Sequence, residues 1–376
     1  MPPENMNHDL ALVASRFQLG GRFLDAAPHG SGHINDTYAS RVATPQGVRR
    51  YVHQRINTNI FRQPEQLMDN VVRVTRHLGR KIAEAGGNPQ REALTVVPAL
   101  DGRPYWKNEA GNFWRTYLFI EGARSYDIPP APEAVYEAAR AFGRFQRLLS
   151  ELAGPRLNET IPYFHDTPRR MAAFDQALAA DVANRAASAR REIEFAQAHR
   201  AEAGRLVDLL AAGKVPERIT HNDTKFNNAM LDDRTGRGVC VIDLDTVMPG
   251  LAMSDFGDAV RTGATPAAED ERDLSRVVCD LEMFDRLACG YLEEAGWFLT
   301  PAETAELAFS ARLITFEIGL RFLTDYLAGD VYFKIHRPSQ NHDRARAQFA
   351  LVADMERKAA EMEAIVAKHL RRAPAG

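Results

Sequence analysis

Cysteine and long apolar runs are both scarce in this sequence. Three cysteines occur among 376 residues, at positions 240, 279 and 289, and no two of them form a Cys-x-x-Cys pair. Such a set indicates neither a disulfide framework nor a zinc site. No stretch reaches the ~18 consecutive apolar residues of a membrane span, and the N-terminus lacks the basic and apolar regions of a secretion signal. These absences predict a cytoplasmic protein with no membrane contact.

An excess of charge of one sign is also missing. The 47 lysines and arginines are set against 50 aspartates and glutamates, so the formal net charge is only -3. An electrostatic field this weak does not attract nucleic acid, so the predicted partners are small molecules. The oligomeric state stays open. With 376 residues, the chain exceeds the size at which a single core usually stops growing. We therefore expect two lobes with a site between them.

The predicted secondary structure changes character near Gly122. Before this residue, hydrophobic periodicity predicts strands around one inserted helix, and after it mostly helices. The early segments are helix 10–23, strands 37–42, 48–56, 95–100 and 113–120, and helix 65–85. The later ones are helix 131–152, a helical pair over 171–210, a buried strand at 239–242 and a long helix at 342–370. This order predicts an α+β protein with a β-rich N-terminal lobe, 1–122, and a helical C-terminal lobe, 123–376.

The most informative stretch lies in the predicted C-terminal lobe. Phosphoryl transfer needs an oxygen base to orient the attacking hydroxyl, and amide and carboxylate oxygens to bind magnesium. Asp223 and Asn228 have the spacing of a kinase catalytic loop, and Asp243 ends a short apolar strand soon afterwards. An aspartate before an asparagine in a loop can equally be a turn cap. The assembled set favours Asp223 as the catalytic residue, with Asn228 and Asp243 as metal ligands.

The same residues carry a family resemblance. His221-Asn222-Asp223, with Asn228 and Asp243, resembles the His-x-Asp-x-x-x-x-Asn loop and metal aspartate of aminoglycoside phosphotransferase-like enzymes. Longer runs at 220–225, 240–250 and 321–334 resemble N-acetylhexosamine 1-kinases, and the likeness spans most of the chain. The resemblance implies a bilobal protein-kinase-like fold, ATP as donor, Mg2+ as cofactor, and phosphorylation of a sugar hydroxyl. The implied acceptor is the anomeric position of an N-acetylhexosamine.

Two residues near the catalytic loop are expected to support it. In the families that this chain resembles, the position of His221 is chiefly a hydrogen-bonding residue of the loop; a general base is the alternative. Asp255 begins an Asp-Phe-Gly triplet that looks like the metal-binding motif of protein kinases. Order along the chain assigns the metal role to Asp243 instead, and Asp255 matches a later aspartate that braces the loop. Asp245 is either a second ligand or a surface neighbour.

Acceptor-site residues follow mainly from the resemblance. It places Arg321 and Tyr332 near the sugar, where planar donors and an aromatic hydroxyl suit polyol recognition. We also point to Asp325, and to His33 and Asp36 in the N-terminal lobe. Arginine and tyrosine on a helix are commonly surface residues, which is the alternative reading.

The nucleotide is expected to contact the N-terminal lobe at a glycine-containing loop. Gly30 and Gly32 lack the third glycine of a dinucleotide fingerprint and lead into strands, so a Rossmann site is not predicted. In a kinase-like lobe this loop would fold over the nucleotide, although a plain surface turn is the alternative. Backbone groups at a hinge near 119–122, with Glu121, would meet the adenine edge.

The N-terminal lobe lacks the lysine that kinases place on the strand after the hairpin. No lysine occurs before Lys81. Strand alternation puts Gln54 at the usual lysine position and leaves Arg55 as the only cation beside it. The phosphates are then bound differently, or nucleotide affinity is modest.

Several functions stay open at this level. Within the same fold the acceptor could be another monosaccharide, a choline-like amino alcohol or an aminoglycoside. The missing lysine motivates a nucleotide-binding pseudokinase, although a pure binder has no use for Asp223. A helical interaction scaffold built on segment 342–370 is the third class, and the preferred nucleotide is also open.

Overall fold

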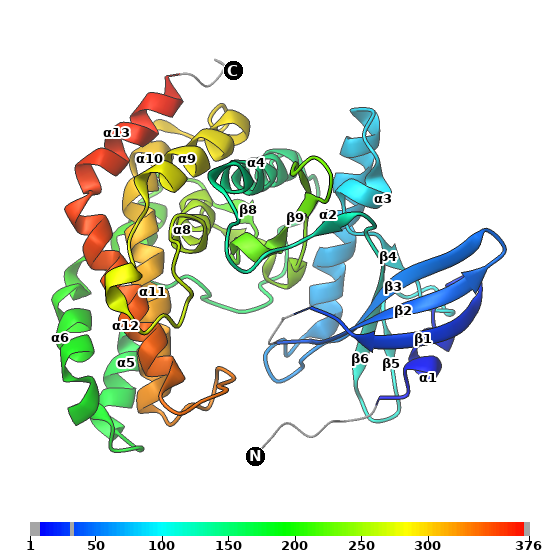
Figure 1. The fold of residues 1–376 in the computed structure, drawn as a ribbon, viewed down its shortest axis with the longest axis horizontal. Helices are drawn as coiled ribbons and strands as arrows, with labels where there is room; N and C mark the ends of the chain where they lie inside the picture. Colours follow the sequence, from blue (N-terminus) through cyan, green and yellow to red (C-terminus); the bar gives the residue numbers. More distant parts are fainter. Residues whose placement is uncertain (1–7, 31–33, 372–376) are drawn as a thin grey trace. The chain divides into compact units, whose positions relative to one another are not determined.

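The structure is a computed structural model that describes residues 8–30 and 34–371. Gly32 and His33 lie outside the described residues. The chain divides into two compact units, Met1–Glu121 (unit 1) and Gly122–Gly376 (unit 2) (Figure 1). Unit 1 is rich in strands and unit 2 in helices, so the predicted α+β class is confirmed.

Unit 1 is built around an antiparallel sheet in the order β1-β2-β3-β6-β4, with β5 paired to β6. β2 and β3, which contain the predicted strand 37–42 and all but the last residue of 48–56, form a hairpin that turns at Gly47 with a positive φ of 117°. One face of the sheet packs on α1 through a buried cluster that includes Val13, Phe17, Tyr51 and Trp114. The elements are α1 (Leu10–Ser15), β1 (Arg22–Pro28), β2 (Asp36–Thr44), β3 (Gly47–Arg55), α2 (Pro64–Glu84), α3 (Pro89–Glu92), β4 (Val96–Val97), β5 (Trp106–Lys107) and β6 (Phe113–Leu118).

The predicted helix 10–23 is wrong beyond its first half. Asp9 caps the N-terminus by accepting the Leu12 N–H at 2.8 Å, and the helix ends at Ser15. Gly20 then adopts a positive φ of 69°, a conformation that glycine tolerates and a helix cannot contain. The apolar residues after this point belong to β1, which makes the edge of the sheet.

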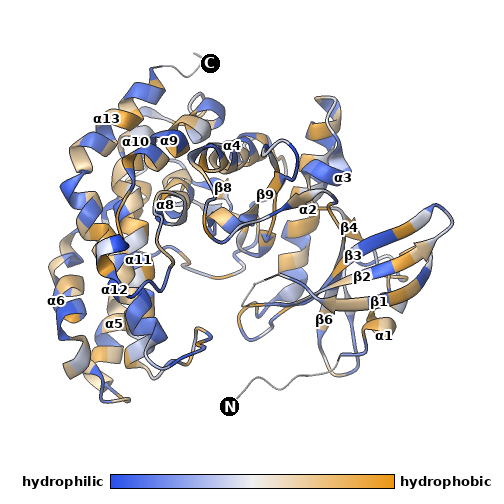
Figure 2. Ribbon diagram, viewed as in Figure 1, coloured by the Kyte–Doolittle hydropathy of each residue, from blue (hydrophilic) through white to orange (hydrophobic). Residues whose placement is uncertain are grey.

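Unit 2 is a helical assembly with two small sheets. α11 is buried along almost its whole length and packs against α5, α8 and α12. On other helices of the unit, apolar and polar residues alternate as expected for amphipathic packing (Figure 2). The helices are α4 (Pro132–Leu149), α5 (Thr167–Ala180), α6 (Arg190–Ala198), α7 (Arg205–Ala211), α8 (Ala252–Gly263), α9 (Leu281–Ala295), α10 (Pro301–Ala305), α11 (Leu307–Leu327), α12 (Gln340–Arg357) and α13 (Ala359–Leu370).

The short strands of unit 2 form the framework of the predicted catalytic segment. β10 (Gly238–Val241), β9 (Ala229–Asp232) and β7 (Ala123–Arg124) make one sheet. β11 (Met248–Gly250) and β8 (Arg218–Thr220) make the other. The loop between β8 and β9 and the turn after β10 therefore project from neighbouring strands. Among the described helices, none combines the length and hydropathy that a membrane span requires.

Two helix predictions in unit 2 need correction. Segment 171–210 contains parts of three helices, α5, α6 and α7, instead of a pair. The long helix expected at 342–370 is broken at Lys358, between α12 and α13. The ammonium group of Lys358 donates to the Cys279 backbone oxygen at 2.7 Å and to Asp354 Oδ2 at 2.7 Å. The contact with Cys279, which is 79 positions away in the sequence, lies where the predicted helix is interrupted.

Candidate active site

The segment from β8 to β9 brings Asp223 and Asn228 into direct contact. Asn228 ends a 3-10 turn, Phe226–Asn228, and is 6% exposed. Its amide Nδ2 donates to the backbone oxygen of Asp223 at 2.8 Å and to Asp223 Oδ2 at 3.2 Å. The Asp223 side chain is 26% exposed. The spacing that marked these residues in the sequence therefore lets one side chain orient the other.

Asp243 belongs to the same corner of unit 2. It lies two residues after the end of β10, is exposed, and adopts a left-handed conformation with φ of 60°. The preceding residue, Ile242, donates its N–H to the Asn228 backbone oxygen at 2.9 Å. The charge of Asp243 also contributes to the raised pKa of Lys225 described below. The three predicted oxygen-bearing residues are thus neighbours in the fold.

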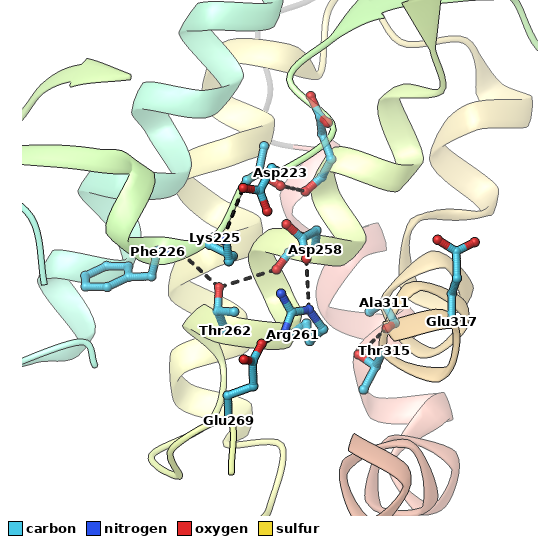
Figure 3. A network of polar contacts seen from close by, with 12 residues as sticks. Asp223, Lys225, Phe226, Asp258, Arg261, Thr262, Glu269, Ala311, Thr315 and Glu317 are labelled. Carbon is cyan, nitrogen blue, oxygen red and sulfur yellow. Dashed lines mark hydrogen bonds and ion pairs between the residues drawn. The ribbon is translucent and has the colours of Figure 1, made fainter. Parts of the chain in front are cut away.

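A lysine that sequence reasoning left without a role completes the group. Lys225 Nζ lies 3.1 Å from Asp223 Oδ2 (Figure 3). Burial is the largest single influence and would raise the pKa of Asp223, but the charge and hydrogen bond of Lys225, acting with other nearby groups such as Arg261, outweigh it, and the pKa is lowered. Asp223 in turn is the main cause of the raised pKa of Lys225. Asp223 is therefore an ionised carboxylate at neutral pH, as a proton acceptor must be.

Asp255 fixes the backbone of the loop from α8. This carboxylate is 1% exposed and accepts the N–H groups of His221 at 2.8 Å and of Asn222 at 2.7 Å. Gln146 Nε2 donates to it at 2.5 Å. With its oxygens engaged in this way, Asp255 has the geometry of a brace and not of a metal ligand.

His221 links the loop to the strand that leads to Asp243. Its Nε2 donates to the backbone oxygen of Ile242 at 2.8 Å, and its Nδ1 accepts the Asp223 N–H at 3.3 Å. These contacts describe a neutral ring with its proton on Nε2. Both nitrogens are occupied by backbone groups, which is the geometry of the supporting role.

A second layer of charge surrounds the 3-10 turn of the loop. Arg261 is 4% exposed and donates to Asp258 at 2.8 Å and to Glu269 at 2.9 Å. Thr262, on the same helix, accepts the N–H of Phe226 at 2.9 Å (Figure 3). α8 therefore supports the turn that carries Asn228 as well as the peptide groups before Asp223.

The donor set at this corner fits a magnesium ion. Over residues 8–30 and 34–371, no cluster of three or more His, Cys, Asp or Glu side chains is arranged to enclose a metal. Magnesium usually takes only one or two protein carboxylates and completes its octahedron with water and phosphate oxygens. An amide oxygen from Asn228 and the exposed carboxylate of Asp243 suit such an open site. Asp245 is not a surface neighbour, since it is 2% exposed.

The predicted acceptor residues Arg321 and Tyr332 lie together in unit 2. The guanidinium carbon of Arg321, on α11, is 5.9 Å from the ring centre of Tyr332 and 5.3 Å from that of Phe164. It also lies 5.5 Å from the ring of Phe333. Tyr332 is 46% exposed. This corner combines a cation with aromatic faces.

Asp325 does not face a ligand, contrary to expectation. It is 4% exposed, and its carboxylate accepts three backbone N–H groups, those of residues 331, 332 and 333, at 2.9, 2.8 and 3.0 Å. Asn341 Nδ2 donates to it at 2.9 Å as well. Asp325 fixes the loop that carries Tyr332. It lies only 6 to 8 positions before the three N–H groups that it binds, so its carboxylate can cap this turn.

In unit 1, the predicted nucleotide residue Arg55 and the predicted sugar residue Asp36 bind each other. Arg55 Nε donates to Asp36 Oδ2 at 2.7 Å, and Nη2 lies 2.5 Å from the same oxygen. Arg55 also donates to Asn112 at 3.3 Å. Glu121 forms an ion pair with Arg50. Gly30, exposed and with φ of 77°, ends the described part of the glycine loop.

Gln54 is joined by an arginine that sequence reasoning missed. Arg115 of β6 is the register partner of Gln54 and donates from Nε to Gln54 Oε1 at 3.0 Å. Gln54 Nε2 donates in turn to Thr37 at 3.1 Å. Arg115 is 1% exposed, unusual for a charged side chain. The pairing of β3 with β6 brings Arg115 next to Gln54. The two residues are 61 positions apart, so no local sequence pattern indicates their contact.

Comparisons with known proteins agree with the geometry. A model of a phosphotransferase enzyme family matches residues 25–287. Among solved structures, amicoumacin kinase in complex with AMP-PNP and Ca2+ is 13% identical with a TM-score of 0.56, covering 94% of each chain. Spectinomycin phosphotransferase in complex with ADP is 12% identical with a TM-score of 0.54, over 93% of this chain and 97% of that one. Choline kinase from Cryptosporidium parvum is 13% identical with a TM-score of 0.52, over 92% and 93%. These likenesses establish a kinase-like fold.

Proposed function

The chain belongs to the phosphotransferase enzyme family, and from this premise we propose that it is an ATP- and Mg2+-dependent kinase that phosphorylates a hydroxyl group of a sugar. The observation that supports the proposal most is the contact group around Asp223. The ionised carboxylate of Asp223 lies 3.1 Å from the Lys225 ammonium and 3.2 Å from the Asn228 amide, and the exposed carboxylate of Asp243 is close enough to act on Lys225. Phosphoryl transfer requires this combination, because its catalysis is mainly positioning and charge stabilisation.

Each residue of the group has a distinct task in this scheme. Asp223 orients the acceptor hydroxyl and accepts its proton as the oxygen attacks the terminal phosphate. Asn228 and Asp243 would bind Mg2+, which supplies neutralisation of phosphate charge when it is present. Lys225 places a positive charge next to the reacting centre, where charge on the transferred group develops.

For the acceptor, we favour an N-acetylhexosamine phosphorylated at the anomeric hydroxyl. Sequence resemblance at 220–225, 240–250 and 321–334 supports this class. The charges near Tyr332 support a neutral acceptor over a cationic one. Arg321 lies beside Arg170, whose pKa is lowered by burial and by the charge of Arg321. A quaternary ammonium or an aminoglycoside would meet this positive field, whereas a neutral sugar would not.

For the donor, we propose that Gln54 takes the place of the strand lysine and that the buried Arg115 supports it. Their side chains are joined at 3.0 Å, at the position where sequence reasoning expected the lysine. Arg115 fixes the Gln54 amide and adds a positive charge behind it, which acts on nearby phosphates without direct contact.

A Mg2+-dependent screen for ADP release tests the function. Free hexoses, N-acetylhexosamines, amino alcohols and aminoglycosides are offered as acceptors, and 31P NMR identifies the phosphorylated position. We expect ADP release with an N-acetylhexosamine and a signal typical of a sugar 1-phosphate. Turnover only with an amino alcohol would reassign the acceptor. ATP binding without turnover on any acceptor would instead indicate a pseudokinase.

A further inference from the structure

A histidine outside the predicted site bridges a buried glutamate and the catalytic loop. His165 lies just before α5, and its side chain is 9% exposed. Its Nδ1 is 2.8 Å from Glu317 Oε1, and its Nε2 is 3.0 Å from the backbone oxygen of Asn222. Asn222 directly precedes Asp223. His165 therefore contacts the peptide group that leads into the proposed catalytic residue.

Both ring nitrogens of His165 face hydrogen-bond acceptors. A backbone oxygen can only accept, and so can an ionised carboxylate, whereas a neutral imidazole has a single N–H to donate. Only the doubly protonated ring satisfies both partners at once. Glu317 is 0% exposed, and its second oxygen accepts from Thr167 Oγ1 at 2.6 Å. A carboxylate so deeply buried stays ionised because it has a cation and a hydroxyl as partners.

The charged groups around this pair agree with a protonated ring. Burial is the largest single influence and would lower the pKa of His165, but the charge and hydrogen bond of Glu317, with Asp258 of α8 and the Asn222 carbonyl, together outweigh it, so the pKa is raised. The pKa of Glu317 is lowered against burial, first by His165 and also by Arg170 of α5. The remaining neighbour in ring contact is Phe164, which carries no charge. The charge of Arg321 of α11 lowers the pKa of Arg170, and through Arg170 it affects Glu317 indirectly.

Asn222 is the residue through which such a contact reaches Asp223. It adopts a positive φ of 63°, which is uncommon for a residue other than glycine. Its N–H is bound by Asp255 at 2.7 Å, and its Nδ2 donates to the Thr246 backbone oxygen at 2.9 Å. Its carbonyl is bound by His165. Rotation of the peptide between Asn222 and Asp223 would redirect the Asp223 carboxylate, and the bond from His165 opposes that rotation.

We propose that His165, kept as an imidazolium by Glu317, is a positioning residue that fixes the Asn222 carbonyl and thereby the direction of the Asp223 carboxylate. The inference rests on the kinase function proposed above and adds a residue that never contacts the substrate. It makes turnover depend on protonation of His165. The productive arrangement is present below the pKa of that ring and is lost as the pH rises through it.

Glu317→Gln separates this role from simple packing. The amide can still accept from the ring and still contact Thr167, but it removes the charge that keeps the second proton on His165. We expect kcat close to that of the wild type at pH 6, with the alkaline decline of kcat displaced to lower pH by about one unit. A packing defect would lower thermal stability without moving this decline.

His165→Gln tests the contact itself, since glutamine has one donor group and cannot serve both acceptors. We expect kcat to fall about 10- to 100-fold, because small displacements of catalytic groups have effects of this size. KM for ATP should change less than about twofold, since the nucleotide is untouched. His199→Gln is the matched control: His199 also bridges a backbone oxygen, of Phe195 at 2.8 Å, and a glutamate, Glu356 at 3.0 Å, but has no contact with the loop.

The protonation state can be measured without turnover. In full-length protein with 15N-labelled histidine, the signals lost in His165→Gln should show both ring nitrogens protonated at pH 7. A single N–H there would overturn the inference, as would an unchanged pH profile in Glu317→Gln while the wild type turns over. If the wild type and His199→Gln transfer phosphate to no acceptor, the proposed function fails instead, and the NMR result still decides whether His165 is an imidazolium.

Discussion

The two units arrange the charged residues of their predicted sites differently. In unit 2, Asp223 and Lys225 lie 3.1 Å apart within one loop, and Asp243 is close enough for its charge to contribute to the raised pKa of Lys225. In unit 1, Arg55 is paired with Asp36 and Glu121 with Arg50. The comparison teaches that the residues predicted to carry the chemistry are gathered within one loop, whereas the charged residues predicted to contact the nucleotide are held in pairs made between segments distant in sequence.

The largest effect should come from Asp223→Asn, which breaks the catalytic side of the comparison. The amide preserves shape but cannot accept a proton, so we expect kcat to fall by about three orders of magnitude or more. ATP affinity, measured by calorimetry, should remain within a few fold. Near-normal turnover in this variant would remove Asp223 from its proposed role.

A stability effect of up to about 3 kcal/mol is expected from His53 in unit 1. The ring is 0% exposed between the hydroxyl groups of Ser40 and Thr116, both at 2.8 Å, and burial lowers its pKa to about 4. The unfolded chain takes up a proton near pH 6.5, so the contribution is complete above that pH and is lost as the pH falls toward 4. Urea unfolding at pH 7 and pH 5 should show the loss in the wild type but not in His53→Gln. A loss of stability of the same size in His53→Gln would show that another group causes the pH dependence.

Asp243→Ala addresses the proposed metal side of unit 2. Removing a carboxylate from an open magnesium site weakens the ion that neutralises phosphate charge, and we expect kcat/KM at low Mg2+ to fall about 100-fold. Part of the loss should be recovered at high Mg2+, because binding is weakened and not abolished. The Mg2+ dependence of ADP release measures both; an unaltered dependence would rule out Asp243 as a ligand.

The smallest of the four effects should come from Arg115→Gln in unit 1. Loss of the buried charge and of the bond that fixes Gln54 should raise KM for ATP about 10-fold and leave kcat within about threefold. Arg41→Gln is the matched control, because Arg41 forms an exposed pair with Asp25 on the same sheet and such pairs contribute little. Equal KM values for the two variants would show that Arg115 only stabilises the sheet.

Sequence reasoning could propose the group around Asp223 because its members are close along the chain. Asp223 and Asn228 lie five positions apart, and the chemistry restricts which residue types can occupy that spacing. Asp255 was placed by its order in the chain, and its bonds to the loop agree with a brace. In each case the signal was local.

What the sequence did not reveal depends on contacts between distant elements. His165 and Glu317 are 152 positions apart, and Gln54 and Arg115 are 61 apart. No periodicity or motif links such pairs, because they are defined only when helices pack or strands take register. The break at Lys358 has the same origin, since its partner Cys279 lies 79 positions away.

Helix α8 has a consequence for how this enzyme fails. Two of its side chains bind the predicted catalytic loop: Asp255 at the peptide groups and Thr262 at the 3-10 turn. Nearly every residue of the helix is buried, and Gly257 lies so close to Ser310 of α11 that an added methyl group would stand 2.5 Å from its backbone oxygen. The predicted catalytic loop is thus supported by a buried, closely packed helix. Heat inactivation should therefore coincide with the cooperative unfolding of the helical unit. Substitutions of buried residues in this unit should abolish activity as completely as substitutions of the exposed site residues.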